Sequence, residues 1–534
     1  MPETLGAFKV SDARRGIEGQ VVRALGSIGA ATLASRVLGF VRDMVVALAF
    51  GAGPVTDAFF VAFRIPNMLR RLLAEGALST AAIPVFSDYL VNAPRQEFFR
   101  MVRAVVAMAL IVLGIVTVIG VAGAPWLVRI IAPGFGDEPG QLALAVLLTR
   151  VMFPYLLLVG LAALAMGLLN AEGRFFTAAL GPALLNVGMI GGVLFGASRL
   201  DPPILALAIG VLVGGVGQLV VQLPELRALG IPLGPSAELS HPALARIGRL
   251  LLPAVFGLAA LQVMVFINTL LASLLPSGSI SFLYYADRVM EFPLGVFGVA
   301  LASASLPAMS RQAAAGDVRG VAGTLNFALR LSAFIAVPAT VGLLLLREPI
   351  TRVLFERGRF TPADTLATSA ALACYAVGLA GFSGARIAAQ AFYAVRAPGI
   401  AVRMGIIAVA VNIVAALSFM TMGIGHPGLA LASSIGAWVN LVALAIAARR
   451  RFGPLGGRAI ARSASRTILA SVPLAGWCVV WLLFWPSRGN LVREAACLAG
   501  AIGGGAVVYW LAAVALHAEE RHSLAGLLPG RRRR

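Results

Sequence analysis

Charge is scarce in this sequence. Only 12% of its 534 residues are Asp, Glu, Lys or Arg, whereas 59% are hydrophobic. A typical soluble domain carries roughly 25% charged residues, and a soluble protein of this length could not cover its surface with so few. The composition therefore excludes an ordinary soluble protein and indicates a chain that resides in lipid.

Cysteine and histidine are also rare. The three cysteines lie in or beside apolar stretches without CxxC spacing, which argues against a disulfide framework or a metal site. The four histidines form no HExxH motif, and the chain has no paired-aspartate motif and no Walker motif. We therefore expect no metal site, no cofactor, no ATP hydrolysis and no enzymatic activity from this chain.

The apolar residues fall into stretches of about 20 residues, the length that crosses a hydrocarbon core about 30 Å thick. These stretches are too long and too evenly apolar for the alternating strands of a membrane barrel. They predict an all-α polytopic membrane protein with about fourteen transmembrane helices. The predicted spans are 27–50, 56–90, 100–122, 142–169, 176–197, 203–223, 244–274, 280–309, 321–346, 364–393, 398–421, 427–448, 464–485 and 493–517.

The basic residues follow the positive-inside rule. The N-terminal tail, the even-numbered loops and the C-terminal tail carry 26 Lys and Arg residues, against 8 in the odd-numbered loops. One odd loop, 347–364, holds four arginines, but it also holds three carboxylates. We therefore expect a multi-pass membrane protein with both termini in the cytoplasm. The net charge of +20 reflects this topology and contact with anionic lipid, and predicts no nucleic-acid partner.

An internal repeat relates the two halves of the chain. The segment GALSTAAIP at 76–84 aligns with VALASASLP at 299–307, an offset of 223 residues. Nearly the same spacing pairs Arg64 with Arg288 and, after a small insertion, Asn186 with Asn412. An even number of spans per copy gives both copies the same orientation, so the repeat is parallel, with a pseudo-two-fold axis along the membrane normal.

The repeat, together with the basic segments, predicts six regions. They are a polar N-terminal segment (1–25), an N-lobe of six helices (26–225), a C-lobe of six helices (226–448), a basic linker (449–463), two further helices (464–517) and a basic tail (518–534).

Charged residues inside the predicted spans concentrate in three of them. A charge at the centre of a membrane helix costs about 2.5–3.5 kcal/mol on insertion scales, so these side chains are expected to face protein or water. They are Arg36, Arg42 and Asp43 in the first span, Asp57, Arg64, Arg70, Arg71 and Glu75 in the second, and Asp287, Arg288 and Glu291 in the eighth.

Because the repeat makes the second and eighth spans equivalent, we expect their polar faces to meet as a cationic cavity between the lobes. Arginine binds phosphate oxygens bidentately and keeps its charge in a poor solvent. The cavity therefore predicts an anionic substrate, and a pyrophosphate-linked lipid would fit it.

The structural alternative is that the same charges form internal salt bridges between helices. This alternative stays open for Asp57, Arg71 and Glu75, whereas a role in binding is favoured for Arg42 and Arg288. Three further arginines stand alone in other spans and are expected to snorkel or to cap helix ends. They are Arg150, Arg330 and Arg386.

The charged segments resemble the MurJ (MviN) family of lipid II flippases over roughly residues 26–450. The motifs that carry the resemblance are SRVLGFVRD at 35–43, TDAFFVAFR at 56–64, PNMLRR at 66–71, AEGA at 74–77, YADRVMEFP at 285–293, FERGRFT at 355–361 and QAFYA at 390–394.

The resemblance implies the multidrug/oligosaccharidyl-lipid/polysaccharide exporter fold, with fourteen helices in two lobes. It implies translocation of lipid II, the undecaprenyl-diphosphate-linked peptidoglycan precursor, from the cytoplasmic to the periplasmic leaflet by alternating access. The last two helices would form a groove for the lipid tail. Lipid II and membrane lipids are the expected partners, together with other cell-wall synthesis proteins. The substrate-binding residues it implies are Arg36, Arg42, Asp43, Asp57, Arg70, Glu75 and Arg288.

In one respect the sequence departs from some members of that family, which resemble sodium-binding transporters with carboxylates on helices 7 and 11. Residues 250–275 and 398–421 contain no Asp or Glu here. A hard cation prefers several oxygen ligands that include carboxylate, so we expect no sodium site of that kind. The alternative function is export of another polyprenyl-linked or amphipathic substrate. A membrane enzyme of polyprenyl-phosphate metabolism is less favoured.

Overall fold

The computed structural model describes residues 34–71, 78–138, 140–232, 234–235, 239–486 and 490–521. Within these residues every regular element is a helix, which confirms the predicted all-α fold class. The predicted segment 1–25, the candidate residue Glu75 and most of the tail 518–534 lie outside the described residues. The chain divides into two compact units, Met1–Leu270 and Leu271–Arg534.

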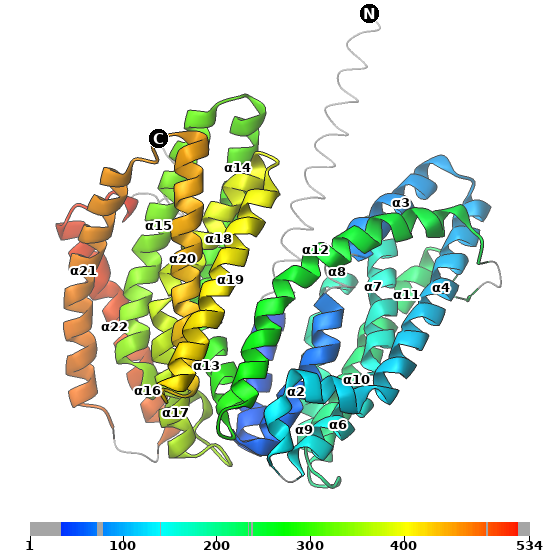
Figure 1. The fold of residues 1–534 in the computed structure, drawn as a ribbon, viewed down its shortest axis with the longest axis horizontal. Helices are drawn as coiled ribbons and strands as arrows, with labels where there is room; N and C mark the ends of the chain where they lie inside the picture. The colour runs from blue at the N-terminus through cyan, green and yellow to red at the C-terminus, as the bar shows by residue number, and fades with distance from the viewer. Residues whose placement is uncertain are drawn as a thin grey trace, which may run out of the picture. The chain divides into compact units, whose positions relative to one another are not determined.

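The first unit begins its described part with a helix over 34–50, which carries the first group of charged residues (Figure 1). The helices that follow are α2 (Pro54–Arg70), α3 (Leu78–Asn92), α4 (Arg95–Ala122), α5 (Ala124–Ile131), η2 (Pro133–Gly136), α6 (Gln141–Met152), α7 (Tyr155–Ala171), α8 (Phe176–Ala179), α9 (Gly181–Gly196), α10 (Leu205–Val220), α11 (Leu223–Ala228) and α12 (Pro242–Ser273), whose last residues belong to the second unit.

The second unit continues with eleven further helical elements in its described part. They are α13 (Ser279–Pro293), the π-helical turn η3 (Leu294–Gly298), α14 (Val299–Ala314), α15 (Val318–Leu345), α16 (Arg347–Phe355), α17 (Pro362–Val377), α18 (Leu379–Ala394), α19 (Pro398–Thr421), α20 (His426–Phe452), α21 (Gly457–Leu483) and α22 (Leu491–Ala515), of which η3 joins α13 to α14.

Eight of the described helices are long and apolar enough to cross a membrane, or nine if the bent pair α17–α18 is one span. Several of the other predicted spans are interrupted, and an interrupted helix is too short to meet that criterion. The predicted span 280–309, for example, is divided among α13, η3 and α14. A multi-span membrane protein is therefore confirmed, while the count of fourteen stays a prediction.

Prolines lie in the helices that carry the charged residues of the second and eighth predicted spans. In the first unit α2 contains Pro66. In the second unit α13 ends at Pro293, and the π-helical turn follows before α14. Proline removes a backbone hydrogen bond from a helix interior and bends or breaks the helix there. In the second unit, therefore, the predicted span 280–309 changes its helical geometry just after its charged residues.

Helices α9 and α10 approach each other closely through small residues. A Cβ atom on Gly188 would lie 2.5 Å from the backbone nitrogen of Gly214, and one on Gly192 would lie 2.4 Å from the carbonyl oxygen of Ala206. Small residues four apart let helix backbones touch inside a membrane, where van der Waals packing drives association. This contact fixes α9, which supplies a polar residue to the site described below.

The C-terminal helices α21 and α22 are attached to the rest of the second unit by polar contacts at both ends. At one end Arg330 on α15 contacts Glu520 at 2.6 Å and Glu519 at 2.5 Å. Ser463 on α21 donates to the same Glu520, whose side chain is buried. The prediction that Arg330 is a lone charge is therefore wrong, because its partners follow the last helix, in the segment expected to be a basic tail.

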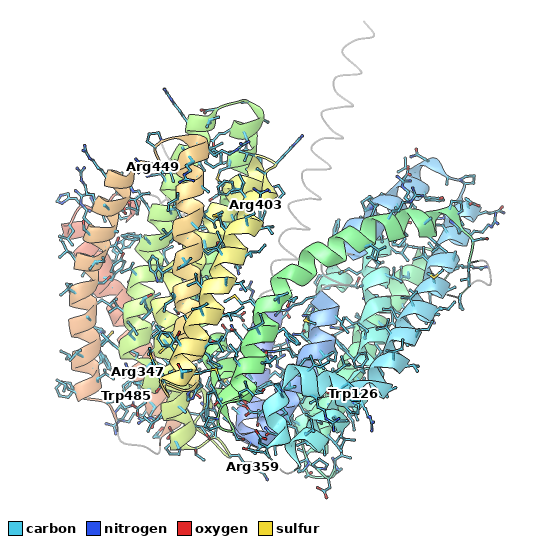
Figure 2. The ribbon with its side chains drawn as sticks, viewed as in Figure 1. Trp126, Arg347, Arg359, Arg403, Arg449 and Trp485 are labelled. Atoms are coloured by element: carbon cyan, nitrogen blue, oxygen red, sulfur yellow. The ribbon has the colours of Figure 1, made fainter. Side chains whose placement is uncertain are left out.

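At the other end Arg352 on α16 pairs with Glu494 in the first turn of α22 at 3.1 Å. Arg352 also donates to the carbonyl oxygen of Pro486 at 3.2 Å and lies over the ring of Trp485. Between the two ends the Tyr509 hydroxyl of α22 donates to the Phe334 carbonyl of α15 at 2.7 Å. Arg347 and Trp485 lie at the opposite end of this unit from Arg449 (Figure 2).

Candidate functional site

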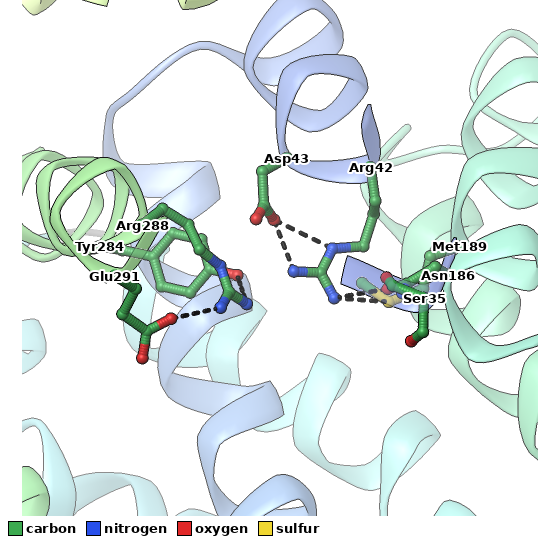
Figure 3. A network of polar contacts seen from close by, with 8 residues as sticks. All are labelled: Ser35, Arg42, Asp43, Asn186, Met189, Tyr284, Arg288 and Glu291. Atoms are coloured by element: carbon green, nitrogen blue, oxygen red, sulfur yellow. Dashed lines mark hydrogen bonds and ion pairs between the residues drawn. The ribbon is translucent and has the colours of Figure 1, made fainter. Parts of the chain in front are cut away.

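The strongest polar cluster in the first unit is built around Arg42 on the helix 34–50. Its side chain is 7% exposed and that of Asp43 is 1% exposed, and the two form an ion pair at 2.6 Å. Both Nε and Nη2 of Arg42 donate to Oδ1 of Asp43 (Figure 3). A charge buried this deeply is tolerated only when it is paired and hydrogen-bonded, and the neighbouring carboxylate provides that pairing.

Asn186 on α9 orients this pair. Its Oδ1 accepts from Nη1 of Arg42 at 3.0 Å, and its Nδ2 donates to the carbonyl oxygen of Ser35 at 3.1 Å. One amide thus bridges two points seven residues apart on the helix 34–50, which fixes the direction of the amide and of the guanidinium. The sulfur of Met189, one turn further along α9, lies 3.9 Å from the same Nη1.

The other predicted residues of the first unit have different surroundings. Asp57 on α2 is 2% exposed. Arg64 donates to the hydroxyl of Thr269, and Arg70 donates from Nε to the Asn67 side chain at 3.1 Å. Arg36 is exposed and has no ion pair within the described part of the chain.

In the second unit Arg288 lies on α13, the helix that ends at the π-helical turn. It forms an ion pair with Glu291 at 2.8 Å and donates to the Tyr284 hydroxyl at 3.3 Å. Its guanidinium also lies 5.4 Å from the centre of the Tyr284 ring, a cation–π contact (Figure 3). The Arg288 side chain is 32% exposed, so it can exchange partners more easily than the buried Arg42.

An aromatic cluster holds α13 in place beside Arg288. Tyr285 is fully buried and its ring lies 5.0 Å from that of Phe355 and 5.5 Å from that of Phe360. Phe355 ends α16, and Phe360 lies just before the capping box of Thr361 and Asp364 that starts α17. The segment predicted as an outer-loop motif therefore acts structurally, because it positions the helix that carries Arg288.

The structure brings together some of the predicted residues and separates others. Arg42 pairs with Asp43, and Arg288 pairs with a carboxylate on its own helix. Arg36 and Asp43 lie seven residues apart on the same helix but differ sharply, since Arg36 is exposed and Asp43 is buried. Sequence reasoning did not assign Asn186 or Tyr284 to the site, although an asparagine inside an apolar span was a usable signal for Asn186.

The arrangement offers anion binding rather than covalent chemistry. Within the described residues no group of three or more His, Cys, Asp or Glu side chains is placed to hold a metal ion. The side chains that converge on Arg42 are a carboxylate, an amide and a thioether, and those around Arg288 are a phenol and a carboxylate. In each unit, therefore, a guanidinium is held by partners that an incoming phosphate could replace.

Comparison with known proteins gives a consistent result. The family model described as "Lipid II flippase MurJ" matches residues 46–489. The chain is 38% identical over 470 residues to the lipid II flippase MurJ of Burkholderia cenocepacia, covering 86% of this chain and 90% of that protein. It is also 38% identical over 444 residues to the probable lipid II flippase MurJ of Vibrio cholerae, covering 82% and 83%.

Solved structures match the fold. A structure of lipid II flippase MurJ in an inward closed conformation superposes with a TM-score of 0.77 at 24% identity, covering 92% of this chain and 99% of that one. A multidrug resistance MATE family transporter of the MOP superfamily, in an inward-facing conformation, superposes with a TM-score of 0.66 at 17% identity, covering 79% and 96%.

Proposed function

Because this chain belongs to the lipid II flippase MurJ family, we propose that it translocates lipid II across the bacterial inner membrane, from the cytoplasmic to the periplasmic leaflet. The observation that carries this proposal is the match to a curated flippase at 38% identity over 86% of the chain. The fold, shared with MurJ and MATE transporters, supports transport by alternating access. The protein is a transporter and not an enzyme.

We infer that the arginines of both units bind the diphosphate of the substrate. Arg36 and Arg288 are accessible enough to meet it directly. Arg42 is different, because its guanidinium is already occupied by Asp43 and Asn186. Binding of a phosphate to Arg42 requires release of Asp43, so substrate binding and opening of the Arg42–Asp43 pair are coupled. A ligand can favour one conformation only if it binds that conformation better, and this exchange provides such a difference.

Lys and Arg residues are concentrated in the two tails and the even-numbered loops, which supports a topology with both termini in the cytoplasm. In this topology residues 26–225 and 226–448 are the two six-helix lobes, and α21 and α22 provide a surface for the polyprenyl tail. Membrane lipids and other cell-wall synthesis proteins are its further partners.

The test measures which leaflet holds lipid II when the protein is depleted from its host. An enzyme added from the periplasmic side, which attacks only outward-facing headgroups, reports the translocated fraction. Depletion is expected to abolish cleavage, and wild-type protein is expected to restore it. If cleavage continues after depletion in a host without a second flippase, lipid II is not the substrate.

The structure determines which variants are informative in that assay. Arg42→Ala leaves the buried Asp43 without its partner, so a loss of function could arise from misfolding. Arg36→Gln and Arg288→Gln change accessible side chains and are expected to fold but to fail in translocation. Arg311→Gln is the matched control, because Arg311 is an exposed arginine at the end of α14. If Arg36→Gln and Arg288→Gln both translocate lipid II at the rate of the control, these arginines do not bind the substrate and their role is structural.

A further inference from the structure

A groove lies between the beginning of α19 and the end of α20 in the second unit. It has a volume of ≈ 360 Å³. Its walls are apolar and its end is basic, with Arg450 and Arg451 of α20 as the charged lining residues. The apolar lining residues are Ile400, Met404, Ala443, Ile446 and Ala447.

Helical spacing explains why these residues share one groove. On α20 the lining residues lie three, four, seven and eight positions after Ala443, so they lie on one face of the helix. Ile400 and Met404 are one turn apart on α19. The two alanines of α20 provide the depth, because their short side chains leave open the space that a larger residue would fill.

The arginines at this end are free of carboxylate partners within the described part of the chain. Arg449, Arg450 and Arg451 are exposed and form no ion pair there, and neither does the exposed Arg403 on α19. Two less exposed arginines of the same unit behave differently, since Arg330 and Arg352 each pair with glutamate. Figure 2 shows Arg403 and Arg449 in the upper part of the second unit.

A further source of positive potential is the start of α19. Its N-cap residue, Ala397, provides no side-chain hydrogen bond, and the positive end of the dipole of this 24-residue helix lies here. Ile400, which lines the groove, lies in this first turn. Uncompensated guanidinium groups beside a helix N-terminus form an anion-binding end, and apolar walls extend from it.

We propose that this groove binds an anionic glycerophospholipid of the cytoplasmic leaflet. The phosphate contacts Arg450 and Arg451, and one acyl chain lies along Met404 and Ile446. Guanidinium groups form bidentate hydrogen bonds with phosphate, and basic pockets between membrane helices are suited to lipid headgroups. A free phosphate has no chain to cover the apolar walls, and a zwitterionic lipid leaves the arginines without compensation. The groove therefore favours an anionic lipid over both.

The test measures phospholipid binding to the full-length purified protein by native mass spectrometry. The probes are dioleoyl phosphatidylglycerol and, with the same acyl chains, dioleoyl phosphatidylcholine. Wild-type protein is expected to retain one phosphatidylglycerol in preference to phosphatidylcholine. Arg450→Gln/Arg451→Gln is expected to weaken that binding about ten-fold or more, because it removes charge-assisted hydrogen bonds. Ala443→Trp keeps both arginines but fills the groove, and is expected to weaken binding as well.

The control Arg311→Gln/Arg319→Gln removes two exposed arginines from the end of α14 and the start of α15, which flank an even-numbered loop like the one after α20. It is expected to bind phosphatidylglycerol as the wild type does. An equal loss of phosphatidylglycerol binding in the control and in Arg450→Gln/Arg451→Gln would show that the lipid responds only to the general surface charge, and would overturn the proposal. Full binding by Ala443→Trp would also overturn it, as would equal retention of the two lipids.

Two further measurements complete the test. Thermal unfolding in detergent confirms that each variant folds, and Ile446→Asn replaces Ala443→Trp if the tryptophan variant does not. Undecaprenyl diphosphate is added as a competitor. If undecaprenyl diphosphate displaces bound phosphatidylglycerol at a lower concentration than added phosphatidylglycerol does, the groove binds the transported lipid and the proposed occupant is wrong. No transport is measured, so the outcome is independent of the proposed function.

Discussion

The pair Arg352–Glu494 makes the sharpest prediction about stability. It joins α16 to α22, and its side chains are only 13% and 8% exposed. Replacing Glu494 by Leu leaves a guanidinium buried without its carboxylate. Removing one partner of a buried pair costs about 3–5 kcal/mol. We expect the lower end, about 3 kcal/mol, because Arg352 keeps its bond to the Pro486 carbonyl and its contact with the Trp485 ring.

The reverse change, Arg352→Met, is expected to cost less. It leaves the carboxylate of Glu494 in the first turn of α22, where the positive end of the helix dipole stabilises an anion. The double variant Arg352→Met/Glu494→Leu replaces the pair by apolar groups of similar size. Such replacements are often neutral or stabilising, so its stability is expected to lie within about 1 kcal/mol of the wild type.

The assay is thermal unfolding of the purified protein in one detergent, scanned at one rate. For a unit of about 250 residues, 1 kcal/mol corresponds to about 2 °C in Tm, so Glu494→Leu is expected to lower Tm by about 6 °C. Arg493→Gln is the control, because Arg493 is an exposed neighbour without an ion pair among the described residues. A double variant as unstable as the sum of the two single variants would refute the reasoning, since the pair would then contribute no coupling.

Three other predictions concern single contacts. Asn186→Leu is expected to cost about 1–3 kcal/mol, because it removes from a buried site both the acceptor for Arg42 Nη1 and the donor to the Ser35 carbonyl, and thermal unfolding against Asn186→Asp, which keeps the acceptor, checks this. Gly192→Leu is expected to abolish recovery of folded protein in size-exclusion chromatography, because its side chain would meet the Ala206 backbone; Gly191→Leu, with open space at the Cβ, is the control and is expected to fold. The hydrogen bond from Arg330 lowers the pKa of Glu519 below its ordinary value of 4.5, so the contact is intact above about pH 4.5 and is lost as pH falls through the lowered pKa. Limited proteolysis of the C-terminal segment is expected to accelerate below that pKa. The variant Glu519→Gln, which lacks the carboxylate, is expected to be cleaved quickly at neutral pH too.

The sequence predicts those features that depend on local spacing. Apolar stretches of membrane length predict the helical fold. The pair Arg288–Glu291 has a helical three-residue spacing that could have predicted it, although the sequence analysis did not assign it. The contact of Arg42 with Asn186 spans 144 residues, and that of Arg330 with Glu520 spans 190. No local pattern encodes such distances, so Arg330 was predicted to stand alone. The helix breaks at Pro293 and η3 were missed for another reason, since hydropathy does not register a π-helical turn.

The attachment of α21 and α22 also bears on whether this helix pair is a separable module. In a chain truncated after α20, Arg330 and Arg352 would lose Glu520 and Glu494 together. Two guanidinium groups that the intact protein neutralises would then stand without counter-charges at opposite ends of the unit. The described part of the second unit that precedes α21 therefore depends on Glu494 and Glu520 for the counter-charges of these two arginines. A shortened ancestor or an engineered protein without α21 and α22 would need uncharged residues in place of Arg330 and Arg352.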